Sequence, residues 1–247
     1  MTDYAHDIIV PYKNSEQGKK QQVAGMFNDI AFRYDFLNRF LSAGIDIRWR
    51  KKAIKQLLTI QPKTILDVAT GTADVAIMAS DILKPDKIIG IDISDGMLDQ
   101  GRKKIQKLGL ENTIELLNGD CETINFKNDS FDAVTVAFGV RNFENLEKGL
   151  TEIRRVLKPG GKLVVLEFSK PQSVVVKAMY NFYMKIICPM AGKIFSKNRD
   201  AYQYLDESIQ KFPEGKNFTN ILDKLGYKNT FTKTLSLGIC SIYCGEK

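Results

Sequence analysis

The stretch Ile65–Val75, ILDVATGTADV, decides the fold of this chain. It joins a short apolar run to Asp74–Leu83, where apolar residues recur at the spacing of a buried helix face. The turn between them has the length of the glycine-rich nucleotide-binding pattern G-x-G-x-x-G, but it keeps only Gly71, with Ala69 first and Asp74 third. The sequence therefore predicts a strand, an altered nucleotide-binding turn and a helix.

Further apolar runs have the continuous hydrophobicity of strands that are buried on both faces. With the first run they span residues 64–69, 87–93, 113–120, 131–138 and 162–168, and helical patterns lie between them at 74–83, 95–109 and 145–157. Two strands at 228–235 and 238–246 end the chain. This order predicts the α/β class: a three-layer, doubly wound, Rossmann-like fold around a mostly parallel, seven-stranded sheet.

The length of 247 residues suits one large domain, which we place at 21–247, after a flexible N-terminus at 1–20. The first twenty residues lack the apolar run of a secretory signal, and no stretch reaches the length of a membrane span. We therefore expect a cytoplasmic protein. Its four cysteines show no metal-ligand spacing, so we expect them to be reduced and we expect no bound metal.

The net charge of +7 has three interpretations: nucleic-acid binding, contact with an anionic membrane surface, or a lysine-rich proteome. The lysines are scattered, without the basic run and interleaved aromatics of an RNA-binding module. We therefore expect no nucleic-acid partner.

Acidic residues follow three successive strands, at the edge where a doubly wound sheet binds its ligand. Asp74 at a helix start would repel a pyrophosphate, so a cationic ligand fits the turn better. Asp92 can accept both hydroxyls of a ribose, Asp120 can meet an adenine amino group, and the Cys121 backbone N–H can reach a ring nitrogen. Ribose and adenine without a phosphate cradle indicate an adenosyl-sulfonium cofactor, and the sequence is similar to class I S-adenosylmethionine-dependent methyltransferases.

Four blocks of sequence narrow this resemblance. They are YDFLNRFLSAGIDIRW (34–49), FGVRNF (138–143), RVLKPGGKLVVLEFS (155–169) and DAYQYLDESIQKFP (200–213). In this order they resemble the family that C-methylates the quinol precursors of menaquinone and ubiquinone, from about Val23 to the C-terminus. Two residues depart from the family pattern: Asp46 replaces a histidine of part of the family, which favours the menaquinone branch, and Ala137 replaces a frequent serine.

The resemblance implies transfer of a methyl group from S-adenosyl-L-methionine to a ring carbon of demethylmenaquinol. We assign cofactor binding to Asp67, Gly71, Thr72, Asp92, Asp120 and Cys121. Among the catalytic candidates, Arg141 would stabilise the quinolate or order a water, and Asn142, Tyr202 and Tyr204 would contact the quinol oxygens. Helices at 21–60 and 171–225 would cover the substrate, with aromatic-rich segments at 34–41 and 174–195 lining a channel for a polyprenyl tail.

Several alternatives stay open at this point. The acceptor could be a benzoquinol precursor of ubiquinone, another phenol or an RNA base. The chain could instead be a non-catalytic scaffold of a quinone-biosynthesis complex, or a dinucleotide oxidoreductase, which Asp74 disfavours. The polyprenyl length and the oligomeric state are also open, with a homodimer as one candidate. A polyprenylated substrate would give the basic surface a use in peripheral membrane contact.

Overall fold

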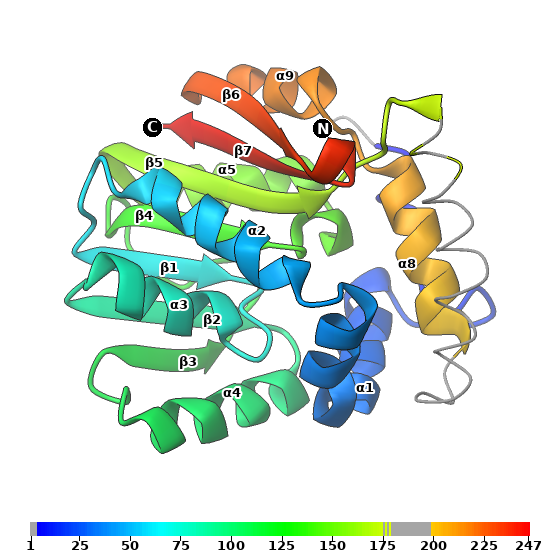
Figure 1. The fold of residues 1–247 in the computed structure, drawn as a ribbon, viewed down its shortest axis with the longest axis horizontal. Helices are drawn as coiled ribbons and strands as arrows, with labels where there is room; N and C mark the ends of the chain where they lie inside the picture. The colour runs from blue at the N-terminus through cyan, green and yellow to red at the C-terminus, as the bar shows by residue number, and fades with distance from the viewer. Residues whose placement is uncertain (1–3, 175, 177, 179–198) are drawn as a thin grey trace.

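The computed structural model describes residues 4–174, 176, 178 and 199–247. Within them, a seven-stranded sheet carries helices on both faces (Figure 1). The strands are β1 (Thr64–Val68), β2 (Lys87–Asp92), β3 (Ile114–Asn118), β4 (Phe131–Ala137), β5 (Leu157–Phe168), β6 (Lys228–Leu235) and β7 (Cys240–Glu246). The helices are α1 (Lys19–Leu41), α2 (Ile45–Ile54), α3 (Asp74–Leu83), α4 (Asp95–Leu108), α5 (Leu146–Val156), α8 (Arg199–Lys211) and α9 (Lys216–Lys224), with short 3-10 turns η1 (Lys55–Leu57), η2 (Val140–Asn142) and η4 (Ser236–Gly238).

The strand order is β3-β2-β1-β4-β5-β7-β6. Neighbours from β3 to β5 run parallel, whereas β7 is antiparallel to both β5 and β6. The predicted fold class, with one antiparallel strand near the end of the chain, is confirmed. Because the strand order reverses between β1 and β4, ligands are expected where the carboxyl ends of these two strands meet.

The two faces of the sheet bury separate cores. Successive residues of β1 point to opposite faces, so Ile65 packs in the core under α2, α3 and α4, while Leu66 packs in the core under α5 and α9. Both side chains are fully buried. The central strands β1, β4 and β5 are therefore buried on both sides, which explains their nearly continuous hydrophobic sequence. The edge strand β3 differs from the expectation, because Glu115 and Asn118 are exposed.

One predicted boundary differs from the structure. The segment Lys158–Gly161 was expected to turn the chain from α5 into a strand starting at 162, but β5 begins at Leu157, directly after α5. The pairing of β5 with β4 skips register between Phe131 and Ala133. Lys158–Gly161 therefore forms an irregularity within the strand, with Gly160 at a φ of 75°.

Helices α1 and α8 lie beyond the carboxyl ends of β1, β2 and β3, across the edge where a ligand is expected (Figure 1). The described residues before α1 also pack on the domain: His6 is fully buried, and the Tyr4 hydroxyl donates to Glu147 at 2.8 Å. The flexibility expected of residues 1–20 stays a prediction. None of the helices in the described part of the chain is long and apolar enough to cross a membrane.

Candidate active site

The loops after β1 and β4 are shaped for close approach. Ala69, Gly71 and Ala73, in the turn after β1, all have positive φ. A Cβ on Gly139, in the loop after β4, would stand 2.5 Å from the Ala69 Cβ, so only glycine fits there. The sharp turn and the missing side chain together leave room above the sheet edge.

A first cavity lies at this edge, over the ends of β1 to β4. Four of the predicted cofactor residues line it: Gly71, Asp92, Asp120 and Cys121. The other walls come from α1 and from the loop after β4, through residues that include Lys20, Val23, Phe27, Tyr34, Phe138, Gly139, Asn142 and Phe143. The structure thus brings together residues that the sequence placed after three different strands.

Asp92 connects two of the loops that line this cavity. Its Oδ2 accepts the Gly71 N–H at 2.8 Å and its Oδ1 accepts the Ser94 N–H at 2.9 Å. Burial raises the pKa of Asp92, and these backbone donors oppose the rise. Each carboxylate oxygen has a second lone pair, so Asp92 can still accept hydrogen bonds from ribose hydroxyls.

Asp67 and Thr72 lie in a small recess beside the first cavity, together with Gly71. The Asp67 carboxylate accepts the hydroxyls of Thr70 and Thr135, both at 2.6 Å, and burial raises its pKa to about 6. The Thr72 hydroxyl donates to Asp35 of α1 at 2.6 Å. Both predicted cofactor residues therefore shape the turn, and their side chains are held by other protein groups.

Asp74 has protein partners of its own. Lys104 Nζ lies 2.7 Å from its Oδ1, and Arg39 Nη2 lies 2.9 Å from its Oδ2. Burial alone would raise the pKa of Asp74, but Lys104, Arg50 and Arg39 hold it below its usual value. Its negative charge is thus balanced within the protein, a pairing that its place at a helix start did not reveal.

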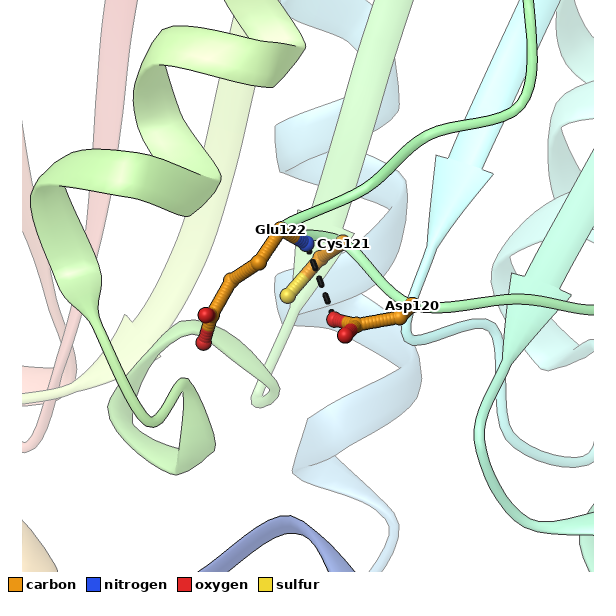
Figure 2. A group of neighbouring side chains, drawn as sticks. All are labelled: Asp120, Cys121 and Glu122. Carbon is orange, nitrogen blue, oxygen red and sulfur yellow. Dashed lines mark hydrogen bonds between the residues drawn. The ribbon is translucent and has the colours of Figure 1, made fainter.

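The turn after β3 carries a group of potential metal ligands, Asp120, Cys121 and Glu122 (Figure 2). Their ligand atoms lie within 4.8 Å of one another, and the Glu122 N–H donates to Asp120 Oδ1. A cation is already present, because Lys20 Nζ lies 2.8 Å from Asp120 Oδ2 and 2.9 Å from Glu122 Oε2. The arrangement suits an ammonium bridging two carboxylates, and the expected lack of a metal stays a prediction.

A second cavity, of about 170 Å³, adjoins the first. Its apolar walls include Met26, Ile30, Leu37, Leu41, Trp49 and Phe168, and its polar lining includes Tyr34, Asn38, Ser42, Asp46, Arg50, Arg141 and Tyr204. Phe27, Tyr34 and Phe138 line both cavities. A ligand in the second cavity would therefore lie next to a ligand in the first.

The predicted catalytic residues divide between the two cavities. Arg141 and Tyr204 line the second and Asn142 lines the first. The Tyr204 hydroxyl lies 3.1 Å from Asn142 Oδ1, which links the two sets. Tyr202 belongs to α8, but its side chain lies outside the described residues, as does most of the aromatic-rich segment 174–195.

Sequence reasoning missed several lining residues. Tyr34 and Phe138 lay within blocks that were recognised as family-like, but neither was singled out, although both border the two cavities. Lys20 was placed in the flexible N-terminus, yet it is in the first turn of α1. Arg50, whose guanidinium lies over the Phe138 ring at 5.4 Å, follows the block 34–49 directly and carried no signal of its own.

Comparisons with known proteins identify the family of this chain. A sequence model of the ubiE/COQ5 methyltransferase family matches residues 15–247. A Bacteroides fragilis protein named demethylmenaquinone methyltransferase is 46% identical over 245 residues, which cover 99% of this chain and all of that protein. A Geobacter sulfurreducens protein named ubiquinone/menaquinone biosynthesis C-methyltransferase UbiE is 42% identical and covers 97% of this chain and 93% of its own length.

Among solved structures, a Thermotoga maritima SAM-dependent methyltransferase, titled a possible histamine N-methyltransferase, aligns with a TM-score of 0.61. The alignment covers 90% of this chain and 99% of that chain at 20% identity. At this identity the likeness concerns the fold alone. It supports the fold class described above.

Proposed function

The chain belongs to the ubiE/COQ5 methyltransferase family, and from this premise we propose that it methylates a ring carbon of demethylmenaquinol to give menaquinol. The family and the fold identify S-adenosylmethionine as the methyl donor, as the sequence predicted. The relatives named demethylmenaquinone methyltransferase support this choice of acceptor.

The observation that carries the proposal is the pair of adjoining cavities. One holds Asp92 and Asp120, the acids suited to an adenosine. The other is apolar and contains Arg141, which suits a flat aromatic acceptor that becomes anionic. Tyr34 and Phe138 form their common boundary, where a donor and an acceptor would meet.

When bound, S-adenosylmethionine supplies a sulfonium methyl carbon that an electron-rich ring carbon can take by direct displacement. The protein must make the acceptor electron-rich, because a quinol carbon is a strong nucleophile only when the neighbouring hydroxyl has lost its proton. Burial in an apolar cavity opposes that ionisation. A fixed positive charge beside the oxygen favours it, and Arg141, 6% exposed, is placed to supply that charge.

The tyrosines of the second cavity complement Arg141. Burial raises the pKa of Tyr204 and the pKa of Tyr34 above their usual values. Both hydroxyls therefore stay protonated at neutral pH, and the Tyr204 hydroxyl donates its hydrogen to Asn142 Oδ1. We assign Arg141 to charge stabilisation, and we assign Asn142, through its contact with Tyr204, to contacts with the quinol oxygens.

Peripheral contact with a membrane is part of the proposal, because a polyprenylated quinol is a lipid. Its support is the net charge of +7 and the 85% exposed side chain of Phe32 on α1, the helix whose Ile30 lines the apolar cavity. Flotation with anionic and neutral liposomes tests this contact. Equal absence from both floating fractions would contradict it.

The test of function is transfer of a labelled methyl group from S-adenosylmethionine to reduced demethylmenaquinone, with a demethylated benzoquinol precursor of ubiquinone in parallel. We expect methylation of the naphthoquinol. Methylation of both acceptors would mean that ring size is not selected. Transfer to neither, with cofactor binding intact, would contradict the proposed acceptor and leave the family and the fold standing.

A further inference from the structure

A buried carboxylate stands behind Arg141. Glu167, next to last in β5, is fully buried, and its Oε1 lies 2.7 Å from Arg141 Nη1. The same oxygen accepts the Phe168 N–H at 2.8 Å, and Oε2 accepts the Arg141 N–H at 3.4 Å. Backbone donors from β5 and η2 thus hold the carboxylate independently of the guanidinium.

The guanidinium is held by several groups at once. Nη1 donates one hydrogen to Glu167 Oε1 and the other, at 2.6 Å, to the Phe138 carbonyl oxygen, so both hydrogens of Nη1 are used. The Arg141 Cζ lies 5.5 Å from the centre of the Phe168 ring. Nε has no hydrogen-bond partner among the described residues. Because Nε is itself buried, the donors on Nη2 are the ones left for an acceptor oxygen in the cavity.

We propose that Glu167 is a positioning residue for the methyl transfer. It fixes the orientation of the Arg141 guanidinium, and its negative charge partly balances the positive charge that Arg141 places beside the second cavity. This inference rests on the proposed role of Arg141. Glu167 acts through Arg141 and is not assigned a contact with substrate or cofactor.

The surroundings make Glu167 the group that balances Arg141. The charged and titratable groups that face the same cavity, or the guanidinium itself, are Glu167 on β5, Tyr204 on α8, Tyr34 on α1, and Arg50 and Asp46 on α2. Asp46 pairs with Arg50 and Arg39, and Glu167 is the acid paired with Arg141. Without it, the cavity would gain an unbalanced positive charge.

Two variants separate orientation from charge. Glu167→Gln keeps an oxygen that can accept from Arg141 and Phe168 but removes the negative charge. The quinolate should then form more easily, and we expect the acid limb of the pH–rate profile to move down by about one unit. Glu167→Asp keeps the charge but withdraws the carboxylate by one methylene. We expect kcat to fall roughly tenfold, with the acid limb unmoved and the KM for S-adenosylmethionine unchanged.

A readout without turnover accompanies these assays. The Nε–H NMR resonance of Arg141, assigned by its loss in Arg141→Lys, reports the order of the guanidinium. We expect it to broaden or shift in Glu167→Asp, while thermal unfolding and S-adenosylmethionine binding show that the variant is folded.

The outcomes are distinct. If the parent protein does not methylate the quinol, the proposed function is wrong, and the NMR resonance still tests whether Glu167 orients Arg141. If both Glu167 variants keep the parent's kcat, pH profile and Nε–H resonance, the positioning role is wrong. A parallel loss of cofactor binding and kcat in both variants would show Glu167 to be only a structural residue.

Discussion

Lys20 Nζ lies 2.8 Å from Asp120 Oδ2, so the first turn of α1 is bound to the loop after β3. The other oxygen of Asp120 accepts the Glu122 N–H, and Lys20 also reaches Glu122. Burial disfavours the Lys20 ammonium, but the two carboxylates raise its pKa above the usual value. The Lys20 ammonium therefore stays charged at any physiological pH, and its contacts hold α1 against the first cavity.

Two further contacts tie α1 to the same edge. Asn28 Oδ1 accepts the Gly96 N–H at 2.9 Å, at the start of α4, and Asp35 accepts the Thr72 hydroxyl after β1. The helix is thus attached in turn to the loops that follow β3, β2 and β1. Because α1 forms one wall of the first cavity, we expect its attachment to limit how fast a cofactor enters or leaves.

Lys20→Ala should speed both association and dissociation of S-adenosylmethionine. A partly exposed ion pair of this kind is worth about 1 kcal/mol, which corresponds to a change of about fivefold in rate. Stopped-flow binding measures both rates. Lys13→Ala is the matched control, because Lys13 pairs with Glu207 at 2.9 Å but does not line the cavity. Unchanged rates in Lys20→Ala would mean that α1 does not limit access.

Asp92→Asn should weaken cofactor binding more than any change at Lys20. The amide places an N–H donor where one carboxylate oxygen accepts from Gly71 or Ser94, and it removes the charge. A charge-assisted hydrogen bond contributes about 1.5 to 3 kcal/mol, so we expect the Kd to rise by roughly tenfold to a hundredfold. Calorimetry measures the Kd. Asp95→Asn, exposed and three residues along the chain, should bind like the parent.

Asp67→Asn should change how stability depends on pH. The pKa of Asp67 is raised by burial from 3.8 to about 6, so its favourable contribution is complete below about pH 3.8 and is lost as pH rises through 6. The shift corresponds to about 3 kcal/mol. Asparagine does not ionise, so the variant should gain stability relative to the parent between pH 4 and pH 7.5.

Urea unfolding at several pH values measures this difference. Asp132→Asn is a control of opposite sign, because burial would raise the pKa of Asp132 but Lys158 and the Thr64 donors lower it. That variant should lose stability relative to the parent as pH rises from 3 to 5. If the difference between Asp67→Asn and the parent were flat with pH, the buried Asp67 would not titrate as described.

Much of the fold could be predicted because the hydrophobic pattern within each short segment determines its secondary structure. The strands β1, β4 and β5 are buried on both faces and have apolar sequences, and α3 has the predicted bounds, Asp74–Leu83. The start of β5 was harder, because Pro159 and Gly160 signal a turn and only pairing with β4 makes them part of a strand. Pairing partners are set by tertiary structure.

The site was predictable in part for the same reason. Acids after strands must meet at the carboxyl edge, so Asp92 and Asp120 were found from topology. The contacts of α1 were not, because Lys20 and Asp120 are separated by 100 residues and nothing in either neighbourhood shows the pairing. The role of Glu167 could not be predicted either. This residue lies within the block 155–169, but its pairing with Arg141 is a tertiary contact that the sequence does not show.

The described N-terminal segment offers a last prediction, on His6. It is fully buried against Phe212, and burial, followed by the charge of Lys19, lowers its pKa from 6.5 to about 3. A released segment would bind a proton below pH 6.5, so packing is favoured above that value and weakens as pH falls toward 3. At pH 5.5 the fraction of molecules with the N-terminal segment released should be about tenfold larger than at pH 7.5.

Hydrogen exchange at Ile9, whose N–H donates to the His6 carbonyl oxygen, measures this fraction as a lower protection factor. His6→Met fills the site without titrating, so its protection should not change with pH. Low protection of Ile9 at pH 7.5 in the parent would instead favour the flexible N-terminus that the sequence predicted, and would leave Lys20 as the first fixed point of the domain.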